Sequence, residues 1–111
     1  MTSRKSMGEF EQLLLLAVLR LKDEAYGVTM RREIEARTGR SVTLGAIYPT
    51  MDRLEQKGFV ASSMSEPTGE RGGRSRRYFR LKPAGLEALH KARETFNSMW
   101  AGHEPGREVT R

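Results

Sequence analysis

The stretch that most constrains this chain is TLGAIYPTMDRLEQKGF, residues Thr43–Phe59. Its apolar side chains recur at spacings of three, four and seven, which places them on one face of a helix. The hydroxyl of Thr43 can cap the first turn. Gly58 can take the left-handed conformation that ends a helix, and Phe59 can fold back over the last turn. The sequence therefore predicts one amphipathic helix whose buried face consists of Leu44, Ile47, Tyr48, Met51 and Leu54.

The opposite face of this helix is small and uncharged at its start and basic further on. It consists of Ala46, Pro49, Thr50, Arg53 and Lys57. Such a face can lie close against a flat anionic partner. The alternative for Arg53 and Lys57 is ordinary surface pairing with the neighbouring Asp52 or Glu55. Pro49 removes one backbone hydrogen bond, so it should bend the helix or loosen its start.

Two shorter helices are expected before this one. Ser6 and Glu9 have capping-box spacing, which predicts a helix beginning near Met7. Its apolar residues, which include Leu13 and Leu16, cover most of its circumference, so it must be covered on two sides. Either it is the central core helix, or its second cover is a partner subunit.

A second helix is expected over Val28–Thr38, opened by Tyr26-Gly27 and ended by Gly39. The short turn from Gly39 to Val42 then leads into the Thr43–Phe59 helix. Two helices joined by a turn of about four residues form the arrangement of a helix-turn-helix.

After Gly58 the apolar period changes from helical to alternating, which predicts strands at Phe59–Ser65 and Arg76–Leu81. The segment between them is rich in Gly and Pro, which predicts the tip of a hairpin. Residues 66–82 contain six basic and two acidic side chains, so this hairpin carries +4 of the chain's net charge of +6.

Pro83 can open a last helix. One stripe of this helix is apolar, and little of the small domain is left for it to pack on. We expect this stripe and the first helix to form a homodimer interface made by Leu13, Leu16, Leu86, Leu89, Phe96, Met99 and Trp100.

The composition excludes several classes of site. The chain has no cysteine, and its two histidines, His90 and His103, lack metal-ligand spacing. The acidic residues form no catalytic pair, and no phosphate-binding loop lies between a strand and a helix. We therefore expect no enzyme activity, metal or cofactor. No apolar run is long enough to span a membrane, and no signal peptide is recognisable, so we expect a cytoplasmic protein.

The expected fold is mainly α-helical with a small β-hairpin: a winged helix-turn-helix followed by a C-terminal dimerisation helix. We expect a basic arm at residues 1–5, the winged helix-turn-helix at 6–82, the dimerisation helix at 83–101 and a tail at 102–111. The helix N-terminus beside an arginine-rich hairpin favours double-stranded DNA as the partner. The alternative is a basic hairpin that is merely solvated.

Two segments also carry a family resemblance: GAIYPTMDRLEQKGFV and GERGGRSRRYFRLKPAGLEAL. Together with Tyr26-Gly27 they resemble the PadR family of bacterial transcriptional regulators, over roughly residues 10 to 100. The resemblance implies a winged helix-turn-helix, a homodimer built through the last helix, and repression by binding a pseudo-palindromic operator in a promoter. Carried over by position, it implies DNA contacts among Ser41, Thr43, Ala46, Tyr48, Pro49, Thr50, Arg53, Arg71, Gly73, Arg74 and Arg76.

The resemblance also raises a second function, the sensing of a small molecule. Some short members of the family bind flat aromatic compounds between tryptophans at the dimer interface. Here Phe96 occupies the comparable place and Trp100 lies one turn later, so both are candidates to line a pocket for a planar aromatic or phenolic effector. The alternative is that they are ordinary aromatics of the dimer core. One departure from the family is Lys82 before Pro83, where a Thr or Ser cap is common.

Overall fold

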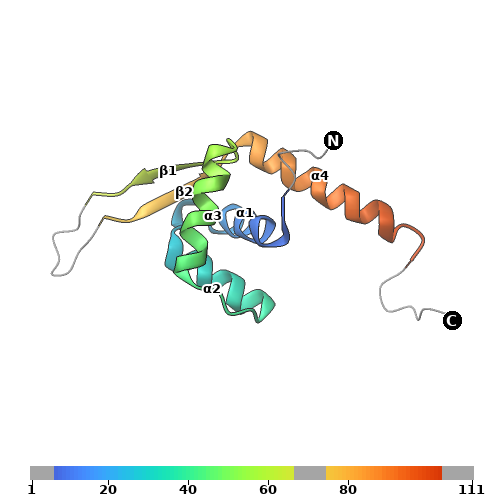
Figure 1. The fold of residues 1–111 in the computed structure, drawn as a ribbon, viewed down its shortest axis with the longest axis horizontal. Helices are drawn as coiled ribbons and strands as arrows, with labels where there is room; N and C mark the ends of the chain where they lie inside the picture. The colour runs from blue at the N-terminus through green and yellow to red at the C-terminus, as the bar shows by residue number, and fades with distance from the viewer. Residues whose placement is uncertain (1–6, 67–74, 104–111) are drawn as a thin grey trace.

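The computed structural model describes residues 7–66 and 75–103. Three helices form a bundle, a two-stranded antiparallel hairpin projects from one side of it, and a long last helix leaves on the other side (Figure 1). The predicted fold class, mainly helical with one small hairpin, is confirmed. The elements are α1 (Glu9–Leu21), the 3-10 helix η1 (Lys22–Glu24), α2 (Gly27–Thr38), α3 (Leu44–Gln56), β1 (Val60–Met64), β2 (Arg77–Leu81) and α4 (Pro83–Trp100).

The ends of α3 are set as the sequence predicts. The Thr43 hydroxyl accepts a hydrogen bond from the Ala46 N–H at 3.1 Å. At the other end Gly58 has φ +83°, and its N–H donates to the Glu55 carbonyl, while the Phe59 N–H donates to the Leu54 carbonyl. This is the Schellman pattern, in which a left-handed glycine satisfies the last carbonyls of a helix. Between these ends α3 runs through Pro49 without a break.

The expected start of α1 near Met7 needs a correction. The helix begins at Glu9, after Gly8, and the Glu11 carboxylate accepts a hydrogen bond from the Gly8 N–H at 3.1 Å. Glu11 thus supplies the reaching-back half of a capping box, because it stands three residues after the N-cap. Ser6, the predicted cap, lies outside the described residues.

The core is formed by the inner faces of the first three helices and closed by residues of the hairpin. Ile47, Met51 and Leu54 of α3 are fully buried, as are Leu14 and Leu15 of α1. The hairpin contributes Val60 and Phe79, which lie on paired strands whose register joins Val60 to Leu81. On α1, Leu16 and Leu19 each remain 41% exposed, so the core of this chain covers only part of that helix.

The start of α4 is fixed by a close approach to the end of α3. Pro83 is its first residue, and Lys82 provides no side-chain cap, as the departure from the family pattern implies. Instead, the Lys82 N–H donates to the Phe59 carbonyl at 2.9 Å. A Cβ on Gly85 would lie 2.3 Å from that same Phe59 oxygen and 2.8 Å from Leu81 Cδ1. Only glycine therefore lets α4 leave the domain along this path.

We predict that Gly85→Ala lowers the free energy of unfolding by about 1–3 kcal/mol, because the added methyl group must displace backbone. Gly45→Ala on α3 is the matched control, since its Cβ would meet no atom closer than 3.9 Å. This control should be neutral or stabilising, because alanine favours a helix. Urea unfolding of both variants measures the difference; equal stabilities would contradict this account of Gly85.

Candidate nucleic-acid interface

The outer face of α3 presents small side chains and one arginine to solvent. Thr43, Ala46, Pro49 and Arg53 are exposed, and Ser41 is exposed in the turn before the helix. This part of the expected contact face is therefore accessible to a partner. The face is narrow because most other positions of α3 are buried or half-buried.

The expectation that Thr50 lies on this outer face is wrong. Its side chain is only 4% exposed. Its hydroxyl donates to the Ala46 carbonyl at 2.9 Å and accepts from Arg53 Nη2 at 3.2 Å. The helix turns Thr50 toward the bundle and uses its hydroxyl there, so we leave it out of the candidate contact surface.

Tyr48 is half-buried and sets the distance between α2 and α3. A Cβ on Gly27 would lie 2.2 Å from the Tyr48 hydroxyl oxygen and 2.7 Å from its Cζ. The Tyr48 ring therefore rests on the first residue of α2, where only glycine leaves room for it. This contact explains why glycine stands at position 27 and tyrosine at position 48, two of the residues that carry the family resemblance.

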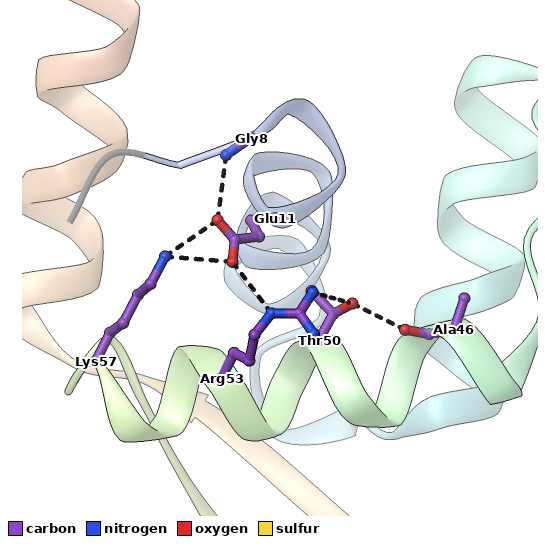
Figure 2. A network of polar contacts seen from close by, with 6 residues as sticks. All are labelled: Gly8, Glu11, Ala46, Thr50, Arg53 and Lys57. Atoms are coloured by element: carbon purple, nitrogen blue, oxygen red, sulfur yellow. Dashed lines mark hydrogen bonds and ion pairs between the residues drawn. The ribbon is translucent and has the colours of Figure 1, made fainter. Parts of the chain in front are cut away.

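Arg53 of α3 and Lys57, which directly follows this helix, contact a carboxylate of another helix. The sequence leaves pairing with Asp52 or Glu55 as the alternative to an open basic face. Instead, Lys57 Nζ lies 3.3 Å from each carboxylate oxygen of Glu11, and Arg53 Nε lies 3.9 Å from Oε2 of the same group (Figure 2). Glu11 belongs to α1, so this network connects the first helix to α3.

The acidic residues of α3 bind the hairpin. Arg77 of β2 forms ion pairs with Asp52 at 2.8 Å and with Glu55 at 2.7 Å. The Ser62 hydroxyl of β1 also donates to Glu55 at 2.9 Å. These bonds, from Ser62 first and then Arg77, lower the pKa of the Glu55 carboxyl. Arg77 therefore attaches the hairpin to α3 and is not available as a free cation.

Arg76, the neighbour of Arg77, faces the opposite way and remains exposed. Its guanidinium carbon lies 4.6 Å from the centre of the Tyr26 ring. The Tyr26 ring in turn contacts Tyr78 edge-on, with 5.3 Å between the ring centres. This aromatic support places one cation where the hairpin meets the start of α2. The sequence predicts Arg76 as a contact residue, but nothing in its spacing indicates that the Tyr26 ring supports it. Arg71, Gly73 and Arg74 lie outside the described residues.

The chain matches the family model described as transcriptional regulator PadR-like family over residues 15–91, from α1 into α4. This protein belongs to the PadR-like family. It is thus a transcriptional regulator and not an enzyme, in agreement with the prediction.

Similar proteins support this assignment. The Mycobacterium tuberculosis transcriptional regulator Rv3488 is 34% identical over 77 residues, which are 69% of this chain and 67% of the relative. A PadR family transcriptional regulator from Eggerthella lenta is 26% identical, with a TM-score of 0.65 over 85% of this chain and 81% of that one. A PadR-like transcription factor from Bacteroides fragilis shares the fold, with a TM-score of 0.68 and 22% identity over 81% of this chain and 82% of that one.

The far end of α4 in this PadR-like regulator is strongly exposed. Phe96, Met99 and Trp100 are 60%, 78% and 59% exposed. Leu89 is only 6% exposed and belongs to the chain's own core, so its expected place in a dimer interface is corrected. Leu13 and Leu86, two other expected interface residues, are half-buried.

A groove of about 590 Å³ lies between the start of α1 and the face of α4 from Ala84 to Phe96. Phe96 lines one end of it, and Trp100 lies one turn beyond. Elsewhere in the described ranges, no group of three or more His, Cys, Asp or Glu side chains could hold a metal ion. No helix in the described part of the chain is long and apolar enough to cross a membrane.

The lowered pKa of Glu55 predicts an acid sensitivity. A carboxyl whose pKa is lower in the folded than in the unfolded chain stabilises the fold above its unfolded pKa, and this contribution disappears as the pH falls through the folded value. Glu55→Gln should therefore be less stable than the natural protein at neutral pH. It should also lose less stability when the pH drops below the ordinary value of 4.5.

Thermal unfolding between neutral pH and about pH 3 measures this effect, a range that spans the ordinary Glu pKa. Glu66→Gln, two residues after the end of β1, is the charge-matched control and should keep the acid sensitivity of the natural protein. Parallel pH profiles for Glu55→Gln and the natural protein would contradict the role given to the Arg77–Glu55 pair.

Proposed function

We propose that this PadR-like regulator is a homodimer that binds double-stranded DNA at a pseudo-palindromic operator and represses a promoter there. In each subunit the exposed face of α3 lies in the major groove, with Thr43, Ala46, Pro49 and Arg53 toward the bases. The hairpin lies on the sugar-phosphate backbone of the DNA next to that groove. The observation that carries the proposal is that α3 exposes a narrow face of small side chains beside a strongly basic hairpin.

The small side chains matter because they allow a helix to approach base edges closely. An α-helix fits the major groove, and an arginine there can donate two hydrogen bonds to guanine. The N-terminus of α3 also presents backbone N–H groups, which favour phosphate. These features support α3 as the element that discriminates between DNA sequences.

The hairpin supplies a different kind of contact. Arg77 is neutralised by Asp52 and Glu55, whereas Arg76 is exposed at the junction with α2. The sequence adds Arg71 and Arg74 between the two strands, and such a concentration of cations suits phosphate oxygens, which are the same in every DNA sequence. The hairpin thus contributes affinity that depends strongly on salt.

The dimer is supported by the exposed apolar side chains at the end of α4 and on α1. Phe96, Met99 and Trp100 together form a surface that a second copy of the chain would cover. Two copies related by a two-fold axis present two α3 helices, and such pairs read half-sites one DNA turn apart, about 34 Å. Occupation of such a site within a promoter would block transcription.

The double variant Arg74→Ala/Arg76→Ala should weaken DNA binding broadly across sequences. Log K falls with log salt concentration, and each phosphate contact that is lost reduces the steepness of this fall by about 0.9. Loss of two contacts should therefore reduce the steepness by about 1.8. Filter binding or anisotropy at several salt concentrations measures the slope.

The control for this experiment is Lys91→Gln/Arg93→Gln, which removes the same charge from α4, a helix that leads away from α3 and the hairpin (Figure 1). This control should keep the natural slope. An unchanged slope in the Arg74/Arg76 variant would contradict the contacts assigned to the hairpin.

A second candidate function, the sensing of a planar aromatic or phenolic effector, is favoured by the groove that ends at Phe96. Trp100 is the only tryptophan of the chain, so its fluorescence reports directly on this region. We expect its emission to move to shorter wavelength as the dimer forms, because the ring becomes buried.

We expect quenching by planar aromatic cations or phenolic acids if effectors bind beside it; a panel without any response would contradict effector sensing at this place.

A further inference from the structure

We propose that Glu11 of α1 is a positioning residue for sequence discrimination, because it fixes the direction in which Arg53 leaves α3. This inference rests on the proposed DNA-binding function and adds a residue that is not on the contact surface itself. The observation behind it is that one carboxylate of the first helix lies between two cations, Arg53 of α3 and Lys57 at the C-cap of that helix (Figure 2).

The carboxylate of Glu11 is itself rigidly held. Its side chain is 13% exposed, and it accepts hydrogen bonds from the Gly8 N–H at 3.1 Å and from Lys57 Nζ at 3.3 Å. It also stands in the first turn of α1, where the helix dipole favours negative charge. Because the carboxylate is fixed from several sides, it restricts the position of a cation that pairs with it.

The guanidinium group of Arg53 is hydrogen-bonded at one nitrogen and attracted by a carboxylate at another. Nε lies 3.9 Å from the Glu11 carboxylate, and Nη2 donates to the Thr50 hydroxyl at 3.2 Å. Thr50 is fixed in turn, because it donates to the Ala46 carbonyl. A guanidinium is planar with five N–H donors, so a hydrogen bond at Nη2 together with the attraction of Nε toward the carboxylate favours one plane and one direction for the remaining donors.

The remaining part of Arg53 is available to a partner, since its side chain is 57% exposed. Recognition of guanine by arginine requires two hydrogen bonds in one plane, so it depends on the orientation of the group. A phosphate contact depends far less on orientation and is the same in every sequence. Glu11 would therefore favour base contacts of Arg53 over indiscriminate phosphate contacts.

The charges lead to the same expectation. With Glu11 present, the two cations and one carboxylate leave a local charge of +1. Without the carboxylate, this local charge would rise to +2. Binding to any duplex would become stronger, while discrimination between duplexes would fall.

A structural alternative gives a different result. If the network only connects α1 to α3, loss of the carboxylate would lower the stability of the fold without changing the ratio of affinities for two DNA sequences. The ratio is thus the measurement that separates positioning from simple support.

The test uses Glu11→Gln in the full chain, because glutamine keeps the shape and its amide oxygen can still accept from the Gly8 N–H. Affinities are measured for the duplex that the natural protein selects and for a scrambled duplex of equal length. We expect the ratio of the two affinities to fall roughly fivefold or more, the lower end of what a bidentate arginine contact contributes. The salt slope on the scrambled duplex should steepen by about 0.9, as for one added contact.

Two further variants make the result specific. Glu94→Gln on α4 removes the same charge elsewhere and should leave the ratio unchanged. In an Arg53→Ala background, Glu11→Gln should change the ratio by less than about twofold if Glu11 acts through Arg53, because sites that act through one contact are not additive. An unchanged ratio in Glu11→Gln, or an equal fall in the Arg53→Ala background, would overturn the proposal.

Arg53→Lys covers the case in which Glu11→Gln does not fold. Lysine keeps the charge at an exposed position but has no plane to fix, so the ratio should fall to a similar extent, and a retained ratio would overturn the inference. If the natural protein itself binds the two duplexes with equal affinity, the proposed sequence-specific DNA binding is wrong. That outcome differs clearly from a specific natural protein whose specificity does not depend on Glu11.

Discussion

The burial of the inner face of α3 is the interaction on which the rest of the structure depends. Ile47, Met51 and Leu54 have no exposed surface. Burying a side chain of this size contributes about 1.5–3 kcal/mol, more than the roughly 1 kcal/mol expected of a helix cap. The apolar face therefore decides how α3 is rotated, and the caps at Thr43 and Gly58 only decide where it begins and ends. With that rotation fixed, Ala46, Pro49 and Arg53 must face outward.

The charged residues divide into two groups around this helix. One group is used inside the chain: Arg77 attaches the hairpin to Asp52 and Glu55, and Lys57 attaches α3 to Glu11. The other group faces solvent and includes Arg76, supported by the Tyr26 ring, and most of the Arg53 side chain. A high positive charge in the sequence therefore overstates the charge offered to a partner, since some arginines are already paired.

The sequence could predict those features that depend on neighbours along the chain. The Thr43 cap, the left-handed Gly39 and Gly58, and the start of α4 at Pro83 are all local, and all are confirmed. The burial of Thr50 could not be predicted because a polar residue at the edge of a helix face can lie on either side of its boundary. The apolar face sets the rotation of α3, and the Thr50 hydroxyl then finds a partner in the Ala46 carbonyl. Glu11 was missed because its partner Lys57 is 46 residues away, and nothing in the spacing relates the two. Gly85 was recognised as part of a motif, but its reason, the approach of the Phe59 carbonyl, is visible only in three dimensions.

The central claim is that α3 and the hairpin of a symmetric dimer recognise a specific DNA site. Selection of bound duplexes from a random pool at physiological salt tests it most directly. We expect an enriched pseudo-palindrome with half-sites about one helical turn apart, and a changed preference within the half-sites for Arg53→Ala. A pool that remains random, or the same site selected by the natural protein and by Arg53→Ala, would contradict it.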